Sequence, residues 1–291
     1  MSSLIIAGVD GCEGGRDAVA LGAALAAADD AELLLTGVWP ETLLPLPLLM
    51  GPTTQPLETV EQMLLKTRAE QAPSAITRPL SDLSPARALR RAARDDHARA
   101  IALGSAAETP AGHARAGRDA RQVIHDAPCA VAIAARGLHE RPFAIRSIVV
   151  GIDGGAESEA ALDAAARLGR RLDARLTAVT AFDERMPIRF GPFDGGLEYL
   201  EWEDLVDHQR GVAERVAAEA REQPGVTGAE VRVGDPAREL AKAAADADLL
   251  VLGSRRWGPI SRVVIGSVGH KLLGDAPCSL MVVPRTETDL D

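Results

Sequence analysis

The chain has 291 residues, of which 46% are hydrophobic and 25% are charged, and its formal net charge is −10 at pH 7. This composition is typical of a soluble globular protein, and the acidic excess argues against a nucleic-acid surface, which would carry a basic stripe. Three cysteines do not form a disulfide framework. The N-terminus does not resemble a signal peptide, and no apolar run is long enough to span a bilayer, so we expect a cytoplasmic protein.

The sequence contains an internal repeat. Ile-Ala-Gly-Val-Asp-Gly at 6–11 returns as Val-Val-Gly-Ile-Asp-Gly at 149–154, and Asp-Ala-Pro-Cys at 126–129 returns at 275–278. The offset is 143 residues from Asp10 to Asp153 and 149 residues from Cys129 to Cys278. A period this long indicates domain duplication. We predict one domain over residues 1–138, called copy one, and a second over residues 144–291, called copy two.

Each copy is predicted to begin with a strand, a helix and a second strand. In copy one these elements are Leu4–Val9, Asp17–Ala28 and Glu32–Trp39. In copy two they are Ile148–Ile152, Glu159–Leu172 and Arg175–Phe182. Strand, helix and strand within about 35 residues form a βαβ unit, which implies parallel strands.

The two copies differ in their middle parts. Copy one has an apolar, Pro-rich segment at 40–56 before a predicted helix at 57–71. Copy two has a Gly/Pro segment at 186–196 before a predicted helix at 198–222. Long loops of this kind are often functional. The leucines at 43–49 either form a surface for a partner or fold back over their own core.

The two patterns coincide again in the second part of each copy. Ser84-Pro85 and Asp235-Pro236 each precede a predicted helix, because Ser or Asp before Pro is favourable N-cap chemistry. Strands follow at 100–103 and 249–252, each ending at Gly-Ser, and then a helix and a last strand at 130–134 or 279–283. Each copy is therefore predicted as an α/β domain with a five-stranded, mostly parallel sheet and helices on both faces.

Candidate binding residues follow the strands of copy two. In open parallel sheets, ligands bind beyond the carboxyl ends of the strands, where the strand order reverses. Asp153 follows the first strand, Gly253-Ser254-Arg255-Arg256 follows the fourth, and Gly266-Ser267-Val268 opens the last helix. A Gly-Ser helix start presents N–H groups and a positive dipole end to a phosphate, and Gly253 would let the backbone approach a ligand. Each feature alone is more often a helix cap.

The combined spacing is more specific. Two residues separate Gly253 from position 256, and nine more separate position 256 from Gly266-Ser267. This spacing resembles the Gly-x2-Gly-x9-Gly-Ser/Thr signature of the universal stress protein family. Copy one follows the same layout, so the chain resembles a tandem member. The resemblance implies an adenine nucleotide alpha hydrolase-like, Rossmann-like sandwich, in which many members bind ATP or AMP and others bind no nucleotide. It also implies that strands 130–134 and 279–283 pair within the chain as a pseudo-dimer, which could dimerise again.

The resemblance also implies site residues. In copy two the nucleotide-binding positions would be Gly151, Ile152, Asp153, Ala181, Leu252, Gly253, Arg256, Gly266, Ser267 and Val268. Asp153 would approach the ribose, Ala181 would line the adenine pocket, and the residues from Gly266 would hold phosphates. Arg256 replaces the second glycine of the signature, and its side chain would either fill the phosphate groove or supply a cation.

Copy one departs further from the signature. Its equivalent positions are Asp10, Val38, Gly104, Gly117 and Arg118. Ala107 replaces the second glycine, and Arg118 replaces the hydroxyl residue that would donate to a phosphate. We therefore expect copy one to bind nucleotide weakly or not at all.

The sequence thus predicts an adenine-nucleotide-binding regulator or scaffold of the stress response, with ATP or AMP bound chiefly in copy two. The six histidines lack metal-ligand spacing, so no metal site is expected from a side-chain cluster. Mg²⁺ would come only with the nucleotide, near Asp153. The chain has no P-loop, dinucleotide turn or nucleophile elbow, so no catalytic residue is assigned and ATP hydrolysis would be slow at most. A nucleotide-free interaction module, with an unidentified protein partner, and a weak ATPase or nucleotidyl-type enzyme are the alternatives.

Overall fold

The computed structural model describes residues 3–39, 57–184, 199–257, 262–264 and 266–284. The elements of copy one are β1 (Leu4–Gly8), α1 (Glu13–Asp29), β2 (Glu32–Thr36), β3 (Val38–Trp39), α2 (Leu57–Gln71), β4 (Ile76–Thr77), β5 (Leu80–Ser81), α3 (Pro85–Asp95), β6 (Ala100–Leu103), α4 (Arg118–Ile124) and β7 (Ala130–Ile133). The linker, which is the segment 134–146 between β7 and β8, contains a 3₁₀ turn, η1 (Leu138–Glu140). The elements of copy two are β8 (Ser147–Gly151), α5 (Ala156–Leu172), β9 (Arg175–Phe182), α6 (Tyr199–Glu222), β10 (Gly228–Val233), α7 (Pro236–Ala243), β11 (Leu249–Trp257), β12 (Arg262–Val264), α8 (Ser267–Gly274) and β13 (Ser279–Pro284).

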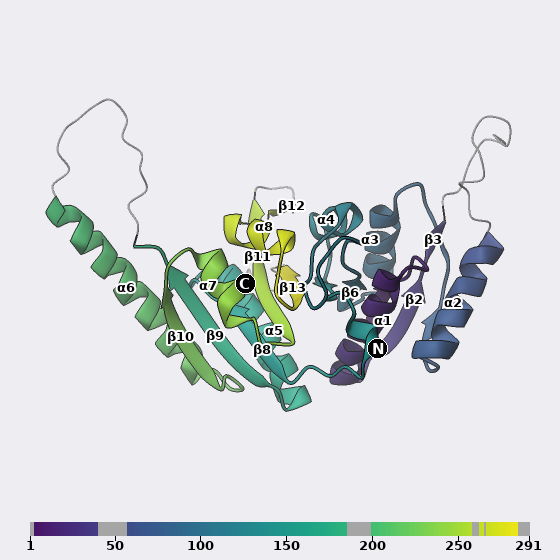
Figure 1. Cartoon of the computed structure of the whole chain (residues 1–291), viewed down its shortest axis with the longest axis horizontal. Coiled ribbons are helices and arrows are strands. Elements are labelled where there is room, and N and C mark those ends of the chain that lie inside the picture. Colours follow the sequence, from purple (N-terminus) through teal and green to yellow (C-terminus); the bar gives the residue numbers. More distant parts are fainter. Residues whose placement is uncertain (1–2, 40–56, 185–198, 258–261, 265, 285–291) are drawn as a thin grey trace, which may run out of the picture.

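The two copies share one continuous sheet (Figure 1). Its strand order is β10-β9-β8-β11-β13-β7-β6-β1-β2-β4, with β12 attached to β11. Within each copy the five strands of this path are parallel, as predicted. The predicted pairing of the last strands is also confirmed: β7 and β13 are antiparallel, with Met281 opposite Ala132. The pseudo-dimer is thus built inside one chain.

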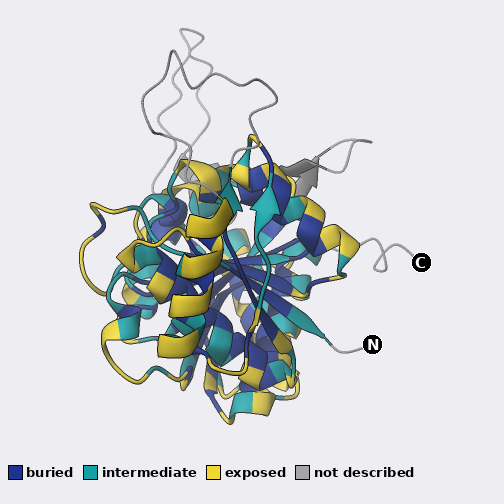
Figure 2. Cartoon of the chain, turned by 90° about the vertical axis from the view of Figure 1, so that its right-hand side faces the viewer, coloured by how far each residue is buried: buried dark blue, intermediate teal, exposed yellow. Residues whose placement is uncertain are grey.

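Helices cover both faces of this sheet. One core lies beneath α1 and α5 and includes Leu21, Leu25, Ala161 and Leu168. The other core lies beneath α3, α4, α7 and α8. Figure 2 shows the buried strands between helices whose outer faces are exposed. The strands carry mostly buried aliphatic residues because both sheet faces are covered.

Two predicted elements differ in the structure. The segment Glu32–Trp39 is not one strand, because β3 leaves the main sheet after Gly37 and pairs with β5 in a separate two-stranded sheet. The strand predicted at 249–252 does not end at Gly253. It continues to Trp257 and pairs with β12 in a hairpin, where Arg255 lies opposite Val264. The expected loop after the fourth strand of copy two is therefore a strand extension.

The predicted helix starts are confirmed. The Ser84 side chain accepts a hydrogen bond from Arg87 N at 3.4 Å, and Asp235 Oδ1 accepts one from Arg238 N at 3.1 Å. The segments at 40–56 and 186–196, including the leucines at 43–49, lie outside the described residues.

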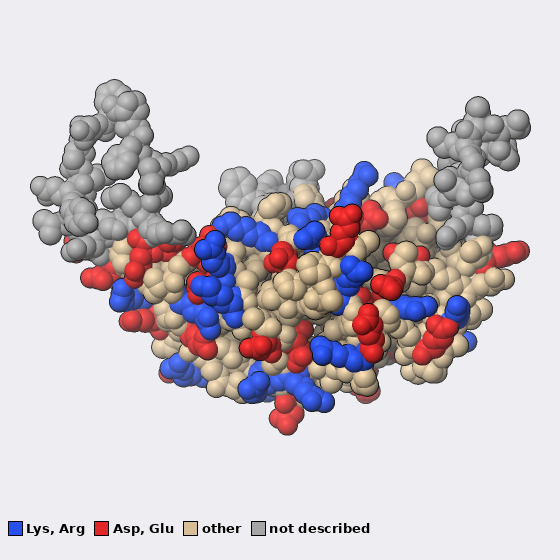
Figure 3. Space-filling view, viewed as in Figure 1, with Lys and Arg blue, Asp and Glu red and all other residues tan. Residues whose placement is uncertain are grey.

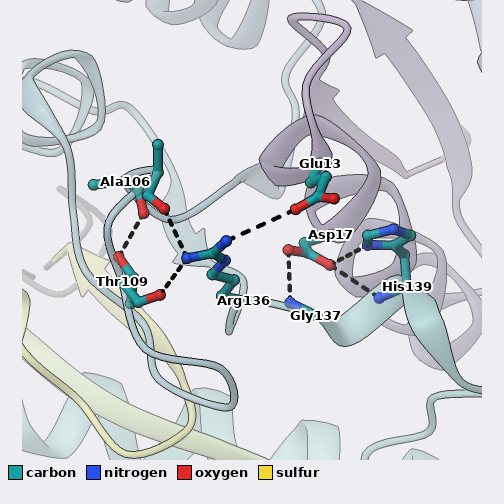
Figure 4. A network of polar contacts seen from close by, with 8 residues as sticks. Glu13, Asp17, Ala106, Thr109, Arg136, Gly137 and His139 are labelled. Carbon is teal, nitrogen blue, oxygen red and sulfur yellow. Dashed lines mark hydrogen bonds and ion pairs between the residues drawn. The ribbon is translucent and has the colours of Figure 1, made fainter.

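The linker is fastened to α1 by a buried carboxylate. Asp17 is fully buried, and its carboxylate accepts hydrogen bonds from Gly137 N at 3.0 Å and from His139 N at 2.9 Å. His139 Nδ1 lies 2.6 Å from Asp17 Oδ1 (Figure 4). Beside this cluster, Arg136 donates to the carbonyl oxygens of Ala107 and Thr109. A buried carboxylate is tolerated because its oxygens are satisfied.

The surface shown in Figure 3 mixes Lys and Arg with Asp and Glu. Among the described residues, no helix is long and apolar enough to cross a membrane.

Candidate functional site

The predicted residues of copy two line one cavity of about 290 Å³. The cavity lies at the carboxyl ends of β8 and β11, where the strand order of this copy reverses. Its lining consists of Gly151, Ile152, Asp153, Glu157, Ser158, Val179, Ala181, Pro236, Leu240, Leu252, Gly253, Gly266, Ser267, Val268 and Gly269. Nine of the ten predicted positions belong to this lining, and the side chain of the tenth, Arg256, is outside the described residues. The spacing signature therefore corresponds to a single site in space.

The Asp153 carboxylate shapes the turn at the cavity floor. Its Oδ1 accepts a hydrogen bond from Gly155 N at 2.9 Å, two residues ahead. Ser158 Oγ accepts from Asp153 N at 3.2 Å and donates to Gly155 O at 2.8 Å. The turn between β8 and α5 is therefore fixed before any ligand arrives, and Asp153 is exposed at the edge of the cavity.

Gly253 is required by a helix backbone rather than by ligand approach alone. A Cβ at this position would lie 2.1 Å from the carbonyl oxygen of Glu157 in the first turn of α5. Gly104 in copy one meets the same constraint, because a Cβ there would lie 2.1 Å from Gly14 O. The expectation that this glycine serves mainly to admit a ligand is therefore incomplete: it first lets the strand end pack against the helix start.

Helix α8 offers its N-terminus to the cavity of copy two. Gly266 is the N-cap residue without a side-chain cap, and Ser267 is exposed at the first helical position. The first N–H groups of a helix have no intrahelical acceptor, so they are available to an anion. The last carbonyls of α8 are capped by copy one, since Arg115 Nε donates to Gly274 O at 3.0 Å and Arg121 Nη2 to Leu273 O at 3.1 Å.

Arg256 belongs to the β11–β12 hairpin, where it lies opposite Val263. Its side chain is outside the described residues.

The equivalent cavity of copy one is larger, at about 380 Å³. All five positions predicted there, Asp10, Val38, Gly104, Gly117 and Arg118, line it. The two walls differ at the helix start. Gly14 and Gly15 stand in copy one where copy two has Glu157 and Ser158, so this part of the copy-one wall has no side chain.

The sequence argument overlooked Glu157 and Ser158. Both lie one turn after Asp153 at the start of α5, and the internal repeat could have revealed them, because copy one has glycine at both equivalent positions. The described lining of the copy-two cavity therefore contains the carboxylates of Asp153 and Glu157, and no Lys or Arg. Copy one has Asp10, Asp119 and the cation Arg118.

The three thiols fall into two classes. Cys129 and Cys278 are buried, and burial raises the pKa of each to about 12. Cys12 is exposed near the cavity of copy one, and the negative charge of Asp10 followed by partial burial raises its thiol pKa. His270 is exposed on α8.

The fold and the sequence have relatives. The sequence profile of the universal stress protein family matches residues 1–135 and 144–284. A Staphylococcus saprophyticus protein bearing the family name is 32% identical over 147 residues, covering 49% of this chain and 84% of its own length.

Among solved structures, a universal stress protein from Archaeoglobus fulgidus is similar with a TM-score of 0.60 and 17% identity, covering 98% of this chain and 99% of its own. A Pseudomonas aeruginosa structure bearing the same family name has a TM-score of 0.65 and 16% identity, covering 97% of this chain and 93% of its own. These two likenesses show the fold. Because the family profile matches both copies and so most of the chain, the protein belongs to the universal stress protein family, as a tandem member.

Proposed function

We propose that copy two binds an adenine nucleotide, ATP or AMP, and that the chain acts through this binding as a regulator or scaffold of the stress response. The observation that carries this proposal is the convergence of nine predicted residues on one cavity at the strand-order reversal. Such crevices are where open α/β sheets bind ligands.

The cavity supplies complementary surfaces for the parts of a nucleotide. Ala181, Val179 and Leu240 offer apolar contact for the base, and the exposed Asp153 carboxylate would accept a hydrogen bond from the ribose. Ser267 and the N–H groups at the start of α8 would donate to phosphate oxygens.

The carboxylates of the lining lead to an expectation about Mg²⁺. Asp153 and Glu157 both belong to the described lining of the cavity. Carboxylate and phosphate oxygens are preferred ligands of Mg²⁺. We therefore expect ATP to bind as its magnesium complex, with much weaker binding when a chelator removes the metal.

Isothermal titration calorimetry on the full chain tests the proposal. ATP with Mg²⁺ should bind saturably, and Ser267→Ala should weaken binding roughly fivefold, the loss of about 1 kcal/mol for one hydrogen bond. The matched control is Asp10→Ala, which makes in copy one the change that Asp153→Ala makes in copy two. Asp153→Ala should weaken binding, whereas Asp10→Ala should not. A flat titration with millimolar ATP and AMP would overturn the proposal and leave the nucleotide-free interaction module.

The variant Arg256→Gly tests the role of the arginine that replaces the second glycine of the signature. If the arginine fills the phosphate groove, the glycine variant should bind ATP more tightly; if it contacts a phosphate, the variant should bind more weakly. Phosphate release measured on the same samples tests the ATPase alternative, which requires turnover above buffer that Asp153→Ala abolishes.

A further inference from the structure

A third cavity, of about 450 Å³, lies at the junction of the two copies. It is bounded by the starts of β1, β6 and β7, the end of β13, and the C-terminal turns of α1 and α5. Its volume is within the roughly 300–1,000 Å³ that is usual for small-molecule sites. It shares no lining residue with the two nucleotide-type cavities.

The duplication identifies a corresponding space on the other side of the junction. Antiparallel pairing of β7 with β13 relates the copies by a pseudo-two-fold axis, so each groove beside these strands occurs twice. On one side the linker runs from the end of β7 to the start of β8, and it buries Leu138 and Ile145 in the core shared by α1 and α5. Within the described residues, no segment crosses the corresponding space between the end of β13 and the start of β1.

The cavity carries charged side chains that the equivalent groove beside the linker lacks. Arg99, Arg167 and Arg171 line the cavity together with one carboxylate, Asp29, which leaves an excess of two positive charges. By the repeat offsets, the equivalent positions on the linker side are Asp248, Ala24 and Ala28. There Asp248 accepts hydrogen bonds from the linker's Arg146 N at 2.8 Å and from Ser147 N at 3.0 Å.

One of the three arginines is available to a ligand. Arg171 Nη1 donates to Asp29 Oδ1 at 2.9 Å, and Arg99 Nη1 lies 3.5 Å from Asp29 Oδ2. Arg167 makes neither a hydrogen bond nor an ion pair with the part of the chain that the structure describes. It is exposed on α5, one turn from Arg171. A guanidinium in this situation suits a carboxylate, which it can bind through two parallel hydrogen bonds.

The rest of the wall is apolar. Leu25, Leu168 and Met281 are buried side chains, and Ala164 is partly buried beside them. The Cys129 thiol in the same wall is neutral at physiological pH, since burial raises its pKa to about 12. The cavity therefore combines an uncharged wall with a cationic rim.

We propose that this junction cavity binds a carboxylate with an unbranched apolar body, of the medium-chain fatty acid class. The apolar body packs against Leu25, Leu168 and Met281, in the way that linker side chains fill the equivalent space on the other side. The carboxylate pairs with Arg167 at the rim. This ligand would bridge copy one and copy two at a place that the nucleotide does not reach.

Calorimetry with decanoate on the full chain tests the proposal. We expect saturable binding of one decanoate per chain, and about tenfold weaker binding of decanol, which has the same apolar body without the charge. Arg167→Ala should weaken decanoate binding about tenfold and should leave decanol binding unchanged. Arg175→Ala is the matched control, because Arg175 is an exposed arginine at the start of β9, outside the cavity.

A second variant tests the cavity without a change of charge. Ala164→Leu places three more carbon atoms in the space and should abolish decanoate binding, while Ser267→Ala in the nucleotide site should leave it unchanged. Melting curves establish that each variant is folded. Binding of decanol as tight as that of decanoate would overturn the proposal, as would full binding by Ala164→Leu.

Residues 285–291 follow Pro284 at this cavity and carry three acidic side chains. If decanoate bound only after Glu287, Asp289 and Asp291 were neutralised, the proposal would also be overturned, because the chain's own carboxylates would then occupy the arginines.

Discussion

The two copies keep one architecture but differ in what they place around the same crevice. In copy one the segment after β6 is tied down: Ser105 Oγ donates to Ala134 O at 2.6 Å and accepts from Arg115 N at 3.0 Å. Ala114 then pairs with Ala276 of copy two. In copy two the equivalent segment is the β11–β12 hairpin, and the buried Ser254 Oγ has no partner within the described residues.

This difference teaches that the segment after β6 in copy one gives structural support to copy two. The segment that would cradle phosphates in copy one caps the end of α8 in copy two, and so supports the helix whose other end lines the second cavity. Yet copy one retains the larger cavity and a cation at its rim. The proposal that copy two rather than copy one binds the nucleotide therefore rests on Ser267, which Arg118 replaces in copy one.

The largest expected effect is the same in both copies. Gly104→Ala and Gly253→Ala should each lower the free energy of unfolding by about 3 kcal/mol, because the added Cβ meets a backbone oxygen that cannot move freely. Denaturant unfolding measures this loss. Gly274→Ala is the control, since a Cβ there has no neighbour within 4 Å. A stable Gly253→Ala that lost only ligand binding would show that the glycine serves the ligand instead.

A smaller effect should be confined to copy one. Asp17→Ala should lower the free energy of unfolding by about 2 kcal/mol, because it leaves the partly buried N–H groups of Gly137 and His139 without their acceptor. The equivalent residue of copy two is already alanine, at position 160. Equal stability of Asp17→Ala and the wild type in urea would show that the linker holds its position without this carboxylate.

An exchange of residues tests whether one position decides which copy binds. Arg118→Ser should give copy one a phosphate donor, and Ser267→Arg should remove it from copy two. We expect changes in ATP affinity of roughly fivefold in opposite directions, the worth of one hydrogen bond near 1 kcal/mol. Calorimetry on both variants and on the double exchange checks this. Parallel changes in both variants would show that the wider surroundings decide.

The smallest effect concerns the reactivity of Cys12, whose equivalent in copy two is Gly155. The charge of Asp10 is the main cause that raises the Cys12 pKa and so lowers its thiolate fraction at pH 7. Asp10→Asn should lower that pKa and speed alkylation of Cys12 a few-fold, while Cys129 and Cys278 stay unreactive until the protein unfolds. Mass spectrometry after iodoacetamide treatment measures this, and ATP that slows the reaction would reveal binding in copy one.

Much of the fold could be predicted because its signals are local. Short β-branched runs, Ala-rich helical spacing and the caps at Ser84 and Asp235 fix elements without distant contacts. The resemblance to the family implied the pairing of β7 with β13 and nine of the described lining residues of the copy-two cavity. The two strands that were predicted wrongly depend on partners elsewhere in the chain. β3 pairs with β5 in a separate sheet, and β11 is longer than predicted because β12 folds back and pairs with it.

The sequence by itself determined that there are two copies of one α/β domain, which residues gather at the carboxyl ends of the strands, and that copy one lost the hydroxyl at position 118. Only the tertiary structure decided why Gly104 and Gly253 are needed, how Asp17 holds the linker, and that one junction groove is filled while the other is lined by arginines. The reason is physical: these features arise from contacts between segments far apart in the chain, whose positions no local pattern encodes.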